Sequence, residues 1–294
     1  MFKSGFVSLV GRPNVGKSTL VNSLIGEKLV ITSDKPQTTR NRISCVLNRE
    51  NAQLIFIDTP GMHKPRHKLG ENMVRISERT LNEVDAVMFL LDASTYFGSG
   101  DKYIVDLISK AKTPGILVIN KIDLVTMEEA KKLEEEVNLS RYFDSVFYIS
   151  ALKGENLTEL VDYLVDLMPE GPKYYPDDMI TDQPERIIVA ELIREKLLHL
   201  TEEEVPHSIA VEIENMVKRQ KKDIIDINAI IYVERKSQKG IVIGKGGQLL
   251  KKVGELARRD IEYLLGTPVF LELWVKEKKD WKNKAGFLHN LGYE

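Results

Sequence analysis

The octapeptide GRPNVGKS at residues 11–18 constrains the fold of this chain more than any other feature. It follows the apolar run FVSLV, which has strand character, and a helix is expected to begin near Lys17. Glycines at 11 and 16 let the backbone curl so that its amides point inward, and the helix adds its positive N-terminal end. The segment predicts a phosphate-binding loop in which Lys17 reaches the β- and γ-phosphates and Ser18 ligates Mg²⁺.

Strand-like and helix-like stretches alternate after this loop. We expect strands at 43–49, 52–58, 86–92, 115–120 and 146–149, and helices at 71–83, 101–111, 127–138 and 155–167. The runs VMFLLD and GILVIN are nearly continuous in apolar residues, as in strands covered on both faces. The pattern predicts an α/β domain with a mostly parallel sheet and helices on both faces, with 43–49 and 52–58 paired antiparallel at one edge.

A second domain is expected after a linker. The stretch PEGPKYYPDD at 169–178 is rich in proline, which is a linker composition. After it the pattern changes to a helix at 185–200, strands at 208–217 and 223–235, a Gly-rich turn, a helix at 247–265 and a strand at 269–276. We therefore expect an α/β domain at 1–170, a linker at 171–183 and an α+β domain at 184–294.

Three further motifs stand at the ends of strands in the first domain, where open α/β sheets bind ligands. In DTPG, Asp58 can hold Mg²⁺ through water, and Gly61 can offer its amide to a γ-phosphate. In NKID, Asp123 can accept from the N1 and N2 hydrogens of guanine, which adenine lacks at those positions. Asn120 can tie the loops together and Lys121 can cover the base, while the segment SAL is expected to wall the base pocket.

A threonine in the loop TSDKPQTTR at 32–40 is expected to ligate Mg²⁺ in the triphosphate state. We favour Thr39, and Thr38 stays open as the alternative. A loop held only through the γ-phosphate and Mg²⁺ relaxes when that phosphate leaves, which would make it a switch. The predicted Mg²⁺ ligands are Ser18, Thr39 and Asp58, and the predicted catalytic groups are Lys17, Thr39 and Gly61.

Five elements follow one another along residues 11–152: GRPNVGKS, the switch threonine, DTPG, NKID and SAL. In this order they resemble the motifs of the translation-factor-related P-loop GTPases. The resemblance implies GTP hydrolysis with Mg²⁺, and it implies that Asn14 helps to bind a K⁺ ion. Met62 stands where Ras-like enzymes carry a glutamine that orients the attacking water, so we expect slow intrinsic hydrolysis. His63 and His67 are candidate bases, although solvated loop histidines are the more ordinary interpretation. The predicted GTP-binding residues are Gly11, Arg12, Pro13, Asn14, Val15, Gly16, Lys17, Ser18, Thr19, Asp58, Thr59, Pro60, Gly61, Met62, Asn120, Lys121, Asp123, Ser150, Ala151 and Leu152.

The second domain contains a GKGG turn at 244–247 between helical segments. Together with the α-β-β-α-α-β order, this turn resembles that of a bacterial-type (type II) KH domain, which implies binding of single-stranded RNA. Glycines allow a nucleic-acid backbone to approach closely, and no Lys-Ser/Thr pair supports the rival interpretation as a second phosphate loop. The predicted RNA-binding residues are Ile241, Ile243, Gly244, Lys245, Gly246, Gly247, Lys251 and Lys252.

The net charge of −2 hides an asymmetry along the chain. Residues 232–294 carry 13 basic and 8 acidic side chains, while the rest is acidic. Such a basic segment indicates a nucleic-acid or membrane surface, or else a chance excess on a solvated face. Trp274 and Trp281 are candidates to stack bases, although the alternating strand around Trp274 favours a core position for it.

A P-loop GTPase domain followed by a KH domain, with QTTRNRI in the switch loop, closely resembles the Era-like GTPases over nearly the whole chain. The resemblance implies binding to the 3′ end of 16S rRNA and a role in maturation of the small (30S) ribosomal subunit. It also implies a cytoplasmic protein that can associate peripherally with the inner membrane. We expect a monomer. The open alternatives are a membrane-surface GTPase and a GTP-gated RNA-binding module with negligible hydrolysis.

The remaining composition fits this interpretation. The single cysteine, Cys45, suits a reducing compartment and is expected to be a small core residue. The N-terminus meets Gly11 too early for a signal peptide, and no stretch approaches about 18 uninterrupted apolar residues, the length of a membrane span. We therefore expect a soluble, intracellular protein.

Overall fold

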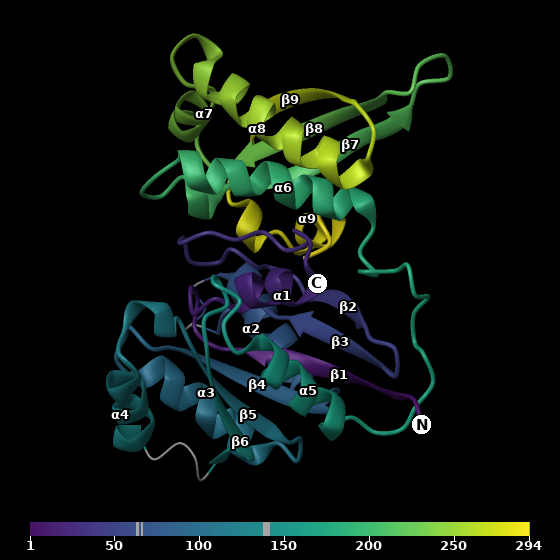
Figure 1. Cartoon of the computed structure of the whole chain (residues 1–294). Coiled ribbons are helices and arrows are strands. Elements are labelled where there is room, and N and C mark those ends of the chain that lie inside the picture. The colour runs from purple at the N-terminus through teal and green to yellow at the C-terminus, as the bar shows by residue number, and fades with distance from the viewer. Residues whose placement is uncertain (63–64, 66, 138–141, 294) are drawn as a thin grey trace. The chain divides into compact units, whose positions relative to one another are not determined.

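The structure is a computed structural model that describes residues 1–62, 65, 67–137 and 142–293 (Figure 1). The chain forms two compact units. The first contains residues 1–30, 39–66 and 70–182, and the second contains residues 31–38, 67–69 and 183–294. Two short segments from the first third of the chain are thus grouped with its C-terminal part.

The first unit is built on a six-stranded sheet of order β2-β3-β1-β4-β5-β6. Only β2 runs antiparallel, at the edge beside β3, and the other neighbouring pairs are parallel, which confirms the predicted α/β class and the predicted edge pair. Its strands are β1 (Lys3–Val10), β2 (Ile43–Asn48), β3 (Ala52–Asp58), β4 (Ala86–Asp92), β5 (Gly115–Asn120) and β6 (Ser145–Ile149). Its helices are α1 (Lys17–Ile25), α2 (Lys68–Thr80), α3 (Ser99–Lys110), α4 (Met127–Val137) and α5 (Leu157–Leu167).

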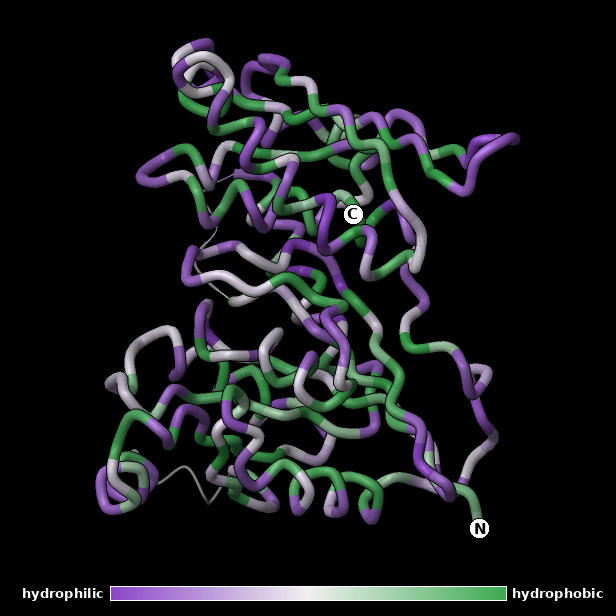
Figure 2. Tube along the Cα trace, turned by 45° about the horizontal axis from the view of Figure 1, so that its top comes forward, coloured by the Kyte–Doolittle hydropathy of each residue, from purple (hydrophilic) through white to green (hydrophobic). Residues whose placement is uncertain are grey.

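Both faces of the central strands are buried. On one face, Phe89 of β4 and Leu117 of β5 pack with Ile104 of α3 in one hydrophobic cluster. Met88 and Leu90 point to the opposite face, because side chains alternate along a strand, and they are buried as well. Figure 2 shows long hydrophobic stretches within the chain and hydrophilic residues at many of its outer loops. This double coverage explains the continuous apolar runs in the sequence.

The residues predicted as a linker contact the edge of this sheet. The side-chain amide of Gln53 on β3 donates to the carbonyl of Tyr175 and accepts from the amides of Tyr174 and Tyr175. Thr181 donates its hydroxyl to the carbonyl of Ser44 on β2. The ring of Tyr174 lies 4.9 Å from that of Phe6. Residues 171–182 therefore run along the first unit as an ordered strap.

The second unit contains a three-stranded sheet of order β7-β8-β9, in which β7 and β8 are antiparallel and β8 and β9 parallel. Helices α6 and α8 cover one face of it (Figure 1), where Ile193, Ala257 and Ile231 share one core. This arrangement is the KH fold that the element order predicts. The elements are α6 (Glu185–Leu200), β7 (Ala210–Lys218), β8 (Ile225–Val233), α7 (Lys236–Ile243), α8 (Gln248–Leu265), β9 (Val269–Glu277) and α9 (Ala285–Asn290).

The structure corrects two details of the sequence prediction. Helix α2 spans residues 68–80 and not 71–83, because the backbone tightens into turns after Arg79, with the amide of Asn82 bonded to the Arg79 carbonyl. The prediction for the tryptophans was wrong: Trp281 is fully buried and donates its indole N–H to the Ser208 carbonyl, whereas Trp274 is 59% exposed. On β9 the odd-numbered residues, such as Val275, face the core, so Trp274 faces outward.

Cys45 lies buried on β2, as expected for a core residue. Burial raises the pKa of its thiol, and the carboxylates of Asp58 and Asp182 raise it further. The thiol is therefore neutral and unreactive at physiological pH. Within the described residues, no helix is both long enough and apolar enough to span a bilayer.

Candidate functional site

The predicted motifs of the first unit meet at the carboxyl ends of its parallel strands. The loop at 11–16 follows β1, and Asp58 ends β3 opposite Leu9 of β1. Asp92 and Asn120 end β4 and β5 as partners in register, and Ser150 follows β6. Parallel pairing therefore gathers the four motifs on one rim, which is where this fold class binds ligands.

The phosphate-loop candidate is closed tightly around its lysine. The ammonium of Lys17 donates to the carbonyls of Gly11 and Arg12 at 3.1 and 3.0 Å. Gly16 has a φ of 100°, and a Cβ there would lie 2.2 Å from the Nδ2 atom of Asn120. Asn14 takes a φ of 68°, a conformation that asparagine tolerates better than most residues. The loop thus needs glycine at position 16 for both conformation and space.

Lys17 and Asp58 are charged groups held out of water. Burial lowers the pKa of Lys17 to about 8, although the nearby Asp58 carboxylate opposes this. Burial raises the pKa of Asp58, while Lys17 and hydrogen bonds from Ser18 and Thr39 work in the other direction. A polyanion would stabilise the charged form of the buried Lys17 ammonium, and a cation would stabilise the charged form of the buried Asp58 carboxylate.

Three of the predicted Mg²⁺ ligands come together. The Ser18 hydroxyl donates to Oδ2 of Asp58 at 2.8 Å, and the Thr39 hydroxyl lies 3.1 Å from the same atom and 3.0 Å from the Ser18 hydroxyl. Oδ1 of Asp58 is buried and has no hydrogen-bond partner among the described residues. Thr38, the alternative, turns its hydroxyl to the Lys35 carbonyl at 2.6 Å instead. Hard oxygen donors around a buried carboxylate fit Mg²⁺.

The base side of the rim is cross-linked by Asn120. Its Nδ2 donates to the Val15 carbonyl and its Oδ1 accepts from the Ala151 amide, both at 2.9 Å, so it joins the phosphate loop to the SAL segment. Ser150 donates its hydroxyl to the Asp123 carboxylate at 2.6 Å. The aliphatic part of Lys121 is held by the ion pair of its ammonium with Asp92, at 2.5 Å.

Gly61 and Met62 lie against the phosphate loop. A Cβ on Gly61 would lie 2.8 Å from the backbone nitrogen of Pro13, so only glycine fits there. The Met62 amide donates to the Gly11 carbonyl at 3.3 Å, and its side chain is buried in the hydrophobic cluster with Phe89. Met62 therefore presents backbone and not its side chain to the rim. His63 lies outside the described residues, and His67 is half-buried.

The GKGG turn of the second unit has the conformation that its glycines permit. Gly244, Gly246 and Gly247 have φ values of 73°, 57° and 79°. A Cβ on Gly244 would lie 2.8 Å from the Cβ of Leu249, so position 244 also lacks space. Lys245, at the tip, is exposed. The turn leaves the backbone open to close approach between α7 and α8.

A groove of about 520 Å³ begins at this turn and runs between α8 and β9. Its walls combine apolar and charged side chains and two glycines: Gly247, Leu250, Lys251, Gly254, Glu255, Arg258, Phe270, Leu271 and Leu273. The two isoleucines predicted to bind RNA do not line this groove, since Ile241 is exposed on α7 and Ile243 packs against the core. The groove is lined by apolar side chains together with two basic side chains and one acidic side chain, and this mixture of apolar and basic groups suits unstacked bases on a phosphate backbone.

Comparison with known proteins supports both halves of this description. Residues 6–121 match the family model "50S ribosome-binding GTPase", and residues 204–282 match the model "KH domain". The GTPase Era of Alkaliphilus oremlandii (strain OhILAs) is 57% identical over 293 residues, covering 100% of this chain and 99% of that protein. The chain belongs to the Era family of GTPases.

Two solved Era structures agree with this assignment. One is a crystal structure of Era in complex with MgGDPNP and nucleotides 1506–1542 of 16S ribosomal RNA, with a TM-score of 0.97 and 43% identity, covering 100% of this chain and 99% of that one. The other is a variant of Aquifex aeolicus Era bound to GDP·AlF₄⁻, with a TM-score of 0.96, 43% identity and 99% coverage of both chains. The predicted resemblance to Era-like GTPases is thereby confirmed, and this chain is a GTPase.

One feature of this Era-family site was missed by sequence reasoning. The guanidinium of Arg12 pairs with the buried carboxylate of Asp101 at 2.9 Å and donates to the hydroxyl of Thr95 and the carbonyl of Tyr96. The side chain of Arg12 therefore anchors the phosphate loop to the start of α3 and to the loop before it. Only the backbone of Arg12 takes part in the phosphate loop itself. No sequence motif marks Asp101, which lies 89 residues downstream of Arg12.

The basic residues of this Era-family chain divide into two groups. Several near the C-terminus are engaged within their own unit: Lys282 pairs with Glu234 at 2.8 Å, Lys276 with Glu214 at 3.4 Å, and Lys278 lies over the Phe287 ring. Those beside the GKGG turn are exposed on the turn and α8, namely Lys245, Lys251, Lys252, Arg258 and Arg259, although Lys251 lies 4.0 Å from Glu255 and Arg258 lies 3.9 Å from Glu262. Exposed basic side chains therefore lie beside the groove and also at other places in the second unit, such as Lys279 and Lys284.

Proposed function

We propose that this protein is a GTP-hydrolysing, Mg²⁺-dependent switch that binds single-stranded RNA through its KH domain, with the 3′ end of 16S rRNA as its target. The proposed role is in maturation of the small (30S) ribosomal subunit. The Era crystallised with MgGDPNP and nucleotides 1506–1542 of 16S rRNA supports both ligands.

The observation that carries the GTP half of the proposal is the convergence of Ser18, Thr39 and Asp58. The hydroxyl oxygens of Ser18 and Thr39 and Oδ2 of Asp58 lie within 3.1 Å of one another, and Oδ1 of Asp58 is buried with no hydrogen-bond partner among the described residues. These residues would hold Mg²⁺, which supplies neutralisation of charge on the β- and γ-phosphates when it is bound. Lys17 would then contact the phosphates, and Asp123 would select guanine over adenine by accepting from N1–H and N2–H.

The groove between α8 and β9 carries the RNA half. It combines Leu271 and Leu273 with Lys251 and Arg258, next to the open backbone at Gly247. Bases can pack against the apolar side chains while phosphates meet the basic side chains and the glycine turn. Trp274 lies on the opposite face of the sheet and is not part of this surface.

Crosslinking in cells tests the target directly. Ultraviolet crosslinking of the full-length protein, followed by sequencing of the bound RNA, is expected to enrich the 3′ end of 16S rRNA over other rRNA segments. The same RNA segment, added to purified protein, is expected to raise the affinity for GTP, because the binding free energies of two linked ligands are reciprocal. It is also expected to raise GTP turnover. Uniform recovery of cellular RNA, with no change in turnover, would reject the proposed target.

Asn14 gives a prediction on monovalent cations. Its side chain is exposed on the phosphate loop, where its amide oxygen is a suitable ligand for K⁺. We expect GTP hydrolysis to be faster in K⁺ than in Na⁺ at equal ionic strength, by about fivefold if the ion lowers the barrier by about 1 kcal/mol. The measurement is the turnover rate in the two salts. Asn14→Gly removes the ligand, and glycine accepts the positive φ, so this variant should show equal rates in both.

We further propose a cytoplasmic location, a monomeric state and peripheral contact with the anionic inner membrane. The buried, neutral thiol of Cys45 is compatible with a reducing compartment. In this proposal, membrane contact uses the exposed basic side chains along α8. RNA and lipid would therefore compete for one surface, and sedimentation with anionic vesicles in the presence and absence of RNA measures this competition.

A further inference from the structure

The segment 31–38 is grouped with residues 183–294 as one compact unit, although it lies between α1 and β2 in the sequence. Helix α6 holds its beginning through both backbone polar groups of Thr32. The Thr32 amide donates to Oε1 of Glu195 at 3.0 Å, and the Thr32 carbonyl lies 2.9 Å from Nε2 of His199. These side chains are four residues apart on α6, so they lie on the same side of the helix.

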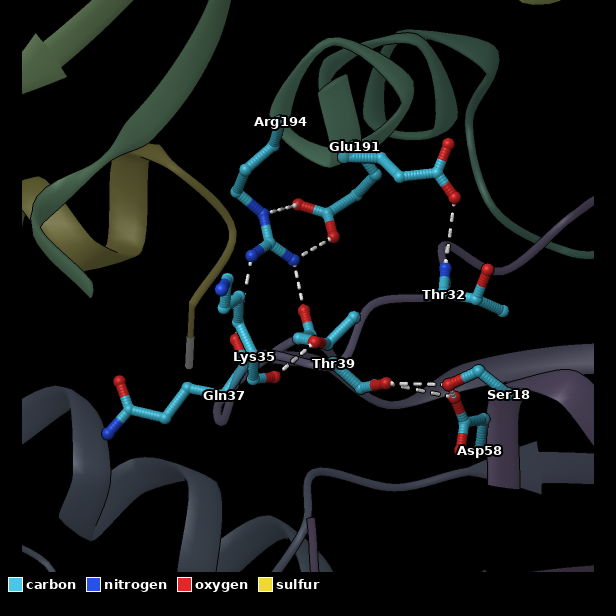
Figure 3. A network of polar contacts seen from close by, with 10 residues as sticks. Ser18, Thr32, Lys35, Gln37, Thr39, Asp58, Glu191 and Arg194 are labelled. Carbon is cyan, nitrogen blue, oxygen red and sulfur yellow. Dashed lines mark hydrogen bonds and ion pairs between the residues drawn. The ribbon is translucent and has the colours of Figure 1, made fainter. Parts of the chain in front are cut away.

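The end of the same segment is held by Arg194 (Figure 3). Its guanidinium donates to the carbonyl of Thr38 and, at 3.5 Å, to the carbonyl of Gln37. The other edge of the guanidinium is occupied by Glu191, which accepts from Nε at 2.8 Å and from a terminal nitrogen. A planar guanidinium with five fixed donors can bridge a carboxylate and two carbonyls at once, whereas an ammonium cannot.

Arg194 and Glu195 are fully buried on α6, the first helix of the KH domain. A buried ion pair adds little net stability compared with apolar side chains of similar size, so packing alone does not account for these charges. The ion pair of Arg194 with Glu191 instead sets an orientation. Glu191 fixes the plane of the Arg194 guanidinium, and the guanidinium in turn fixes the carbonyls of Gln37 and Thr38. The segment 31–38 is thus pinned at both ends by the polar face of one helix.

The next residue after this pinned segment is Thr39, whose hydroxyl lies 3.0 Å from that of Ser18 and 3.1 Å from the Asp58 carboxylate (Figure 3). The peptide between Thr38 and Thr39 is planar, so fixing the Thr38 carbonyl also fixes the amide of Thr39. The Thr38 hydroxyl is occupied locally by the Lys35 carbonyl. Of the two threonines, the backbone therefore directs only Thr39 toward Ser18 and Asp58.

We propose that Arg194, oriented by Glu191 and assisted by Glu195 and His199, is a positioning group that holds the loop 31–38 so that Thr39 reaches the Mg²⁺ site. This inference rests on the proposed role of Thr39 as a Mg²⁺ ligand in the GTP state. A loop already ordered at both ends loses less conformational freedom when Thr39 binds the metal. The clamp therefore favours GTP over GDP and has no direct contact with the nucleotide.

The test uses the full-length chain with Arg194→Met, which keeps the aliphatic volume and removes the guanidinium. We expect the preference for GTP over GDP to fall by about tenfold, the effect of losing charge-assisted hydrogen bonds to backbone carbonyls. The Mg²⁺ concentration for half-maximal GTP hydrolysis should rise and kcat should fall. Affinity for GDP should stay within about twofold of wild type, because Thr39 is a ligand only in the triphosphate state.

Arg186→Met is the matched control. Arg186 is on the same helix and also donates to backbone carbonyls, but these are Ile213 at the β7 bulge and its neighbour Glu214. This variant should keep wild-type nucleotide preference and Mg²⁺ dependence. If Arg194→Met does not fold, Arg194→Lys serves in its place. It retains a charge beside Glu191 without the fork, and we expect the same direction of change with a smaller size.

Thr39→Ala separates this inference from the proposed function. It should reproduce the lowered GTP preference and raised Mg²⁺ requirement of the Arg194 variants. If Thr39→Ala has these effects but folded Arg194 variants behave as wild type, the clamp is overturned and the Mg²⁺ site stands. If Thr39→Ala behaves as wild type, the role of Thr39 is wrong and the clamp falls with it.

Discussion

Replacing Lys17 by alanine is expected to abolish measurable GTP binding while leaving RNA binding intact. The Lys17 ammonium already lies out of water in the folded protein, where burial lowers its pKa to about 8, so it is still mostly protonated at neutral pH. Burial removes the Lys17 ammonium from water, and a negatively charged phosphate replaces the lost hydration with a direct charge interaction. Losing such a buried charge partner costs about 2–5 kcal/mol, so the Kd for GTP should rise at least about thirtyfold.

The measurement is nucleotide titration of the full-length chain, by calorimetry or with a fluorescent GTP analogue. Lys110→Ala is the control, because Lys110 lies on α3 in an exposed pair with Asp106 and should not affect nucleotide affinity. Lys17 also bonds to the carbonyls of Gly11 and Arg12, so the unfolding temperature must be compared. A folded Lys17→Ala protein with wild-type GTP affinity would contradict the phosphate-loop assignment.

The sequence was sufficient for the parts of this protein that depend on local pattern. The phosphate loop is contiguous, and its place after β1 and before α1 follows from apolar periodicity. The mostly parallel sheet follows from alternation of elements, and the antiparallel β2–β3 edge follows from a connection too short for a helix. The KH topology follows from the order of elements around Gly244. In each case a short-range rule determines the long-range arrangement.

Features that depend on pairing between distant residues were not predictable. Arg12 finds Asp101, and Arg194 finds Gln37 and Thr38, only because the fold brings them together. The sequence does not distinguish Arg194 from the other basic residues of α6. Lys196, two residues later, is also basic and buried, but it pairs with Asp260.

The position of Trp274 was different in kind. Alternation along β9 was the correct signal, but its core face is formed by the odd-numbered residues, so the same alternation places Trp274 on the outer face. The face on which such a tryptophan lies can be predicted when the inward and outward positions of the whole strand are assigned first.

Changing the GKGG turn to GDDG, by Lys245→Asp with Gly246→Asp, is expected to eliminate specific RNA binding without unfolding the KH domain. Two carboxylates replace one ammonium where the phosphate backbone is expected to approach. A Cβ at Gly246 would meet nothing within 4 Å, and aspartate tolerates its φ of 57° better than most residues. We expect the Kd for the 3′ segment of 16S rRNA to rise at least about a hundredfold, or about 3 kcal/mol.

The matched control reverses two charges elsewhere in the same domain. Lys221 and Lys222 are exposed in the β7–β8 hairpin and do not line the groove, so Lys221→Asp with Lys222→Asp makes a larger charge change at a different place. If affinity depends on total charge, this control should weaken RNA binding at least as much as GDDG does. If it depends on the turn, the control should lose only the weak, salt-sensitive part of the binding.

The same pair of variants decides between RNA and membrane as the ligand of the basic surface. Anionic vesicles respond to the number of exposed cations and not to a glycine turn, so at about 1 kcal/mol for each lysine lost, lipid binding should fall less in GDDG, which loses one lysine, than in the control, which loses two. RNA binding should fall steeply in GDDG alone. Loss of vesicle binding in GDDG with unchanged RNA affinity would assign the turn to the membrane and refute RNA binding at the GKGG turn. The reason is that close approach of a nucleic-acid backbone is the one property that these glycines add to a cationic surface.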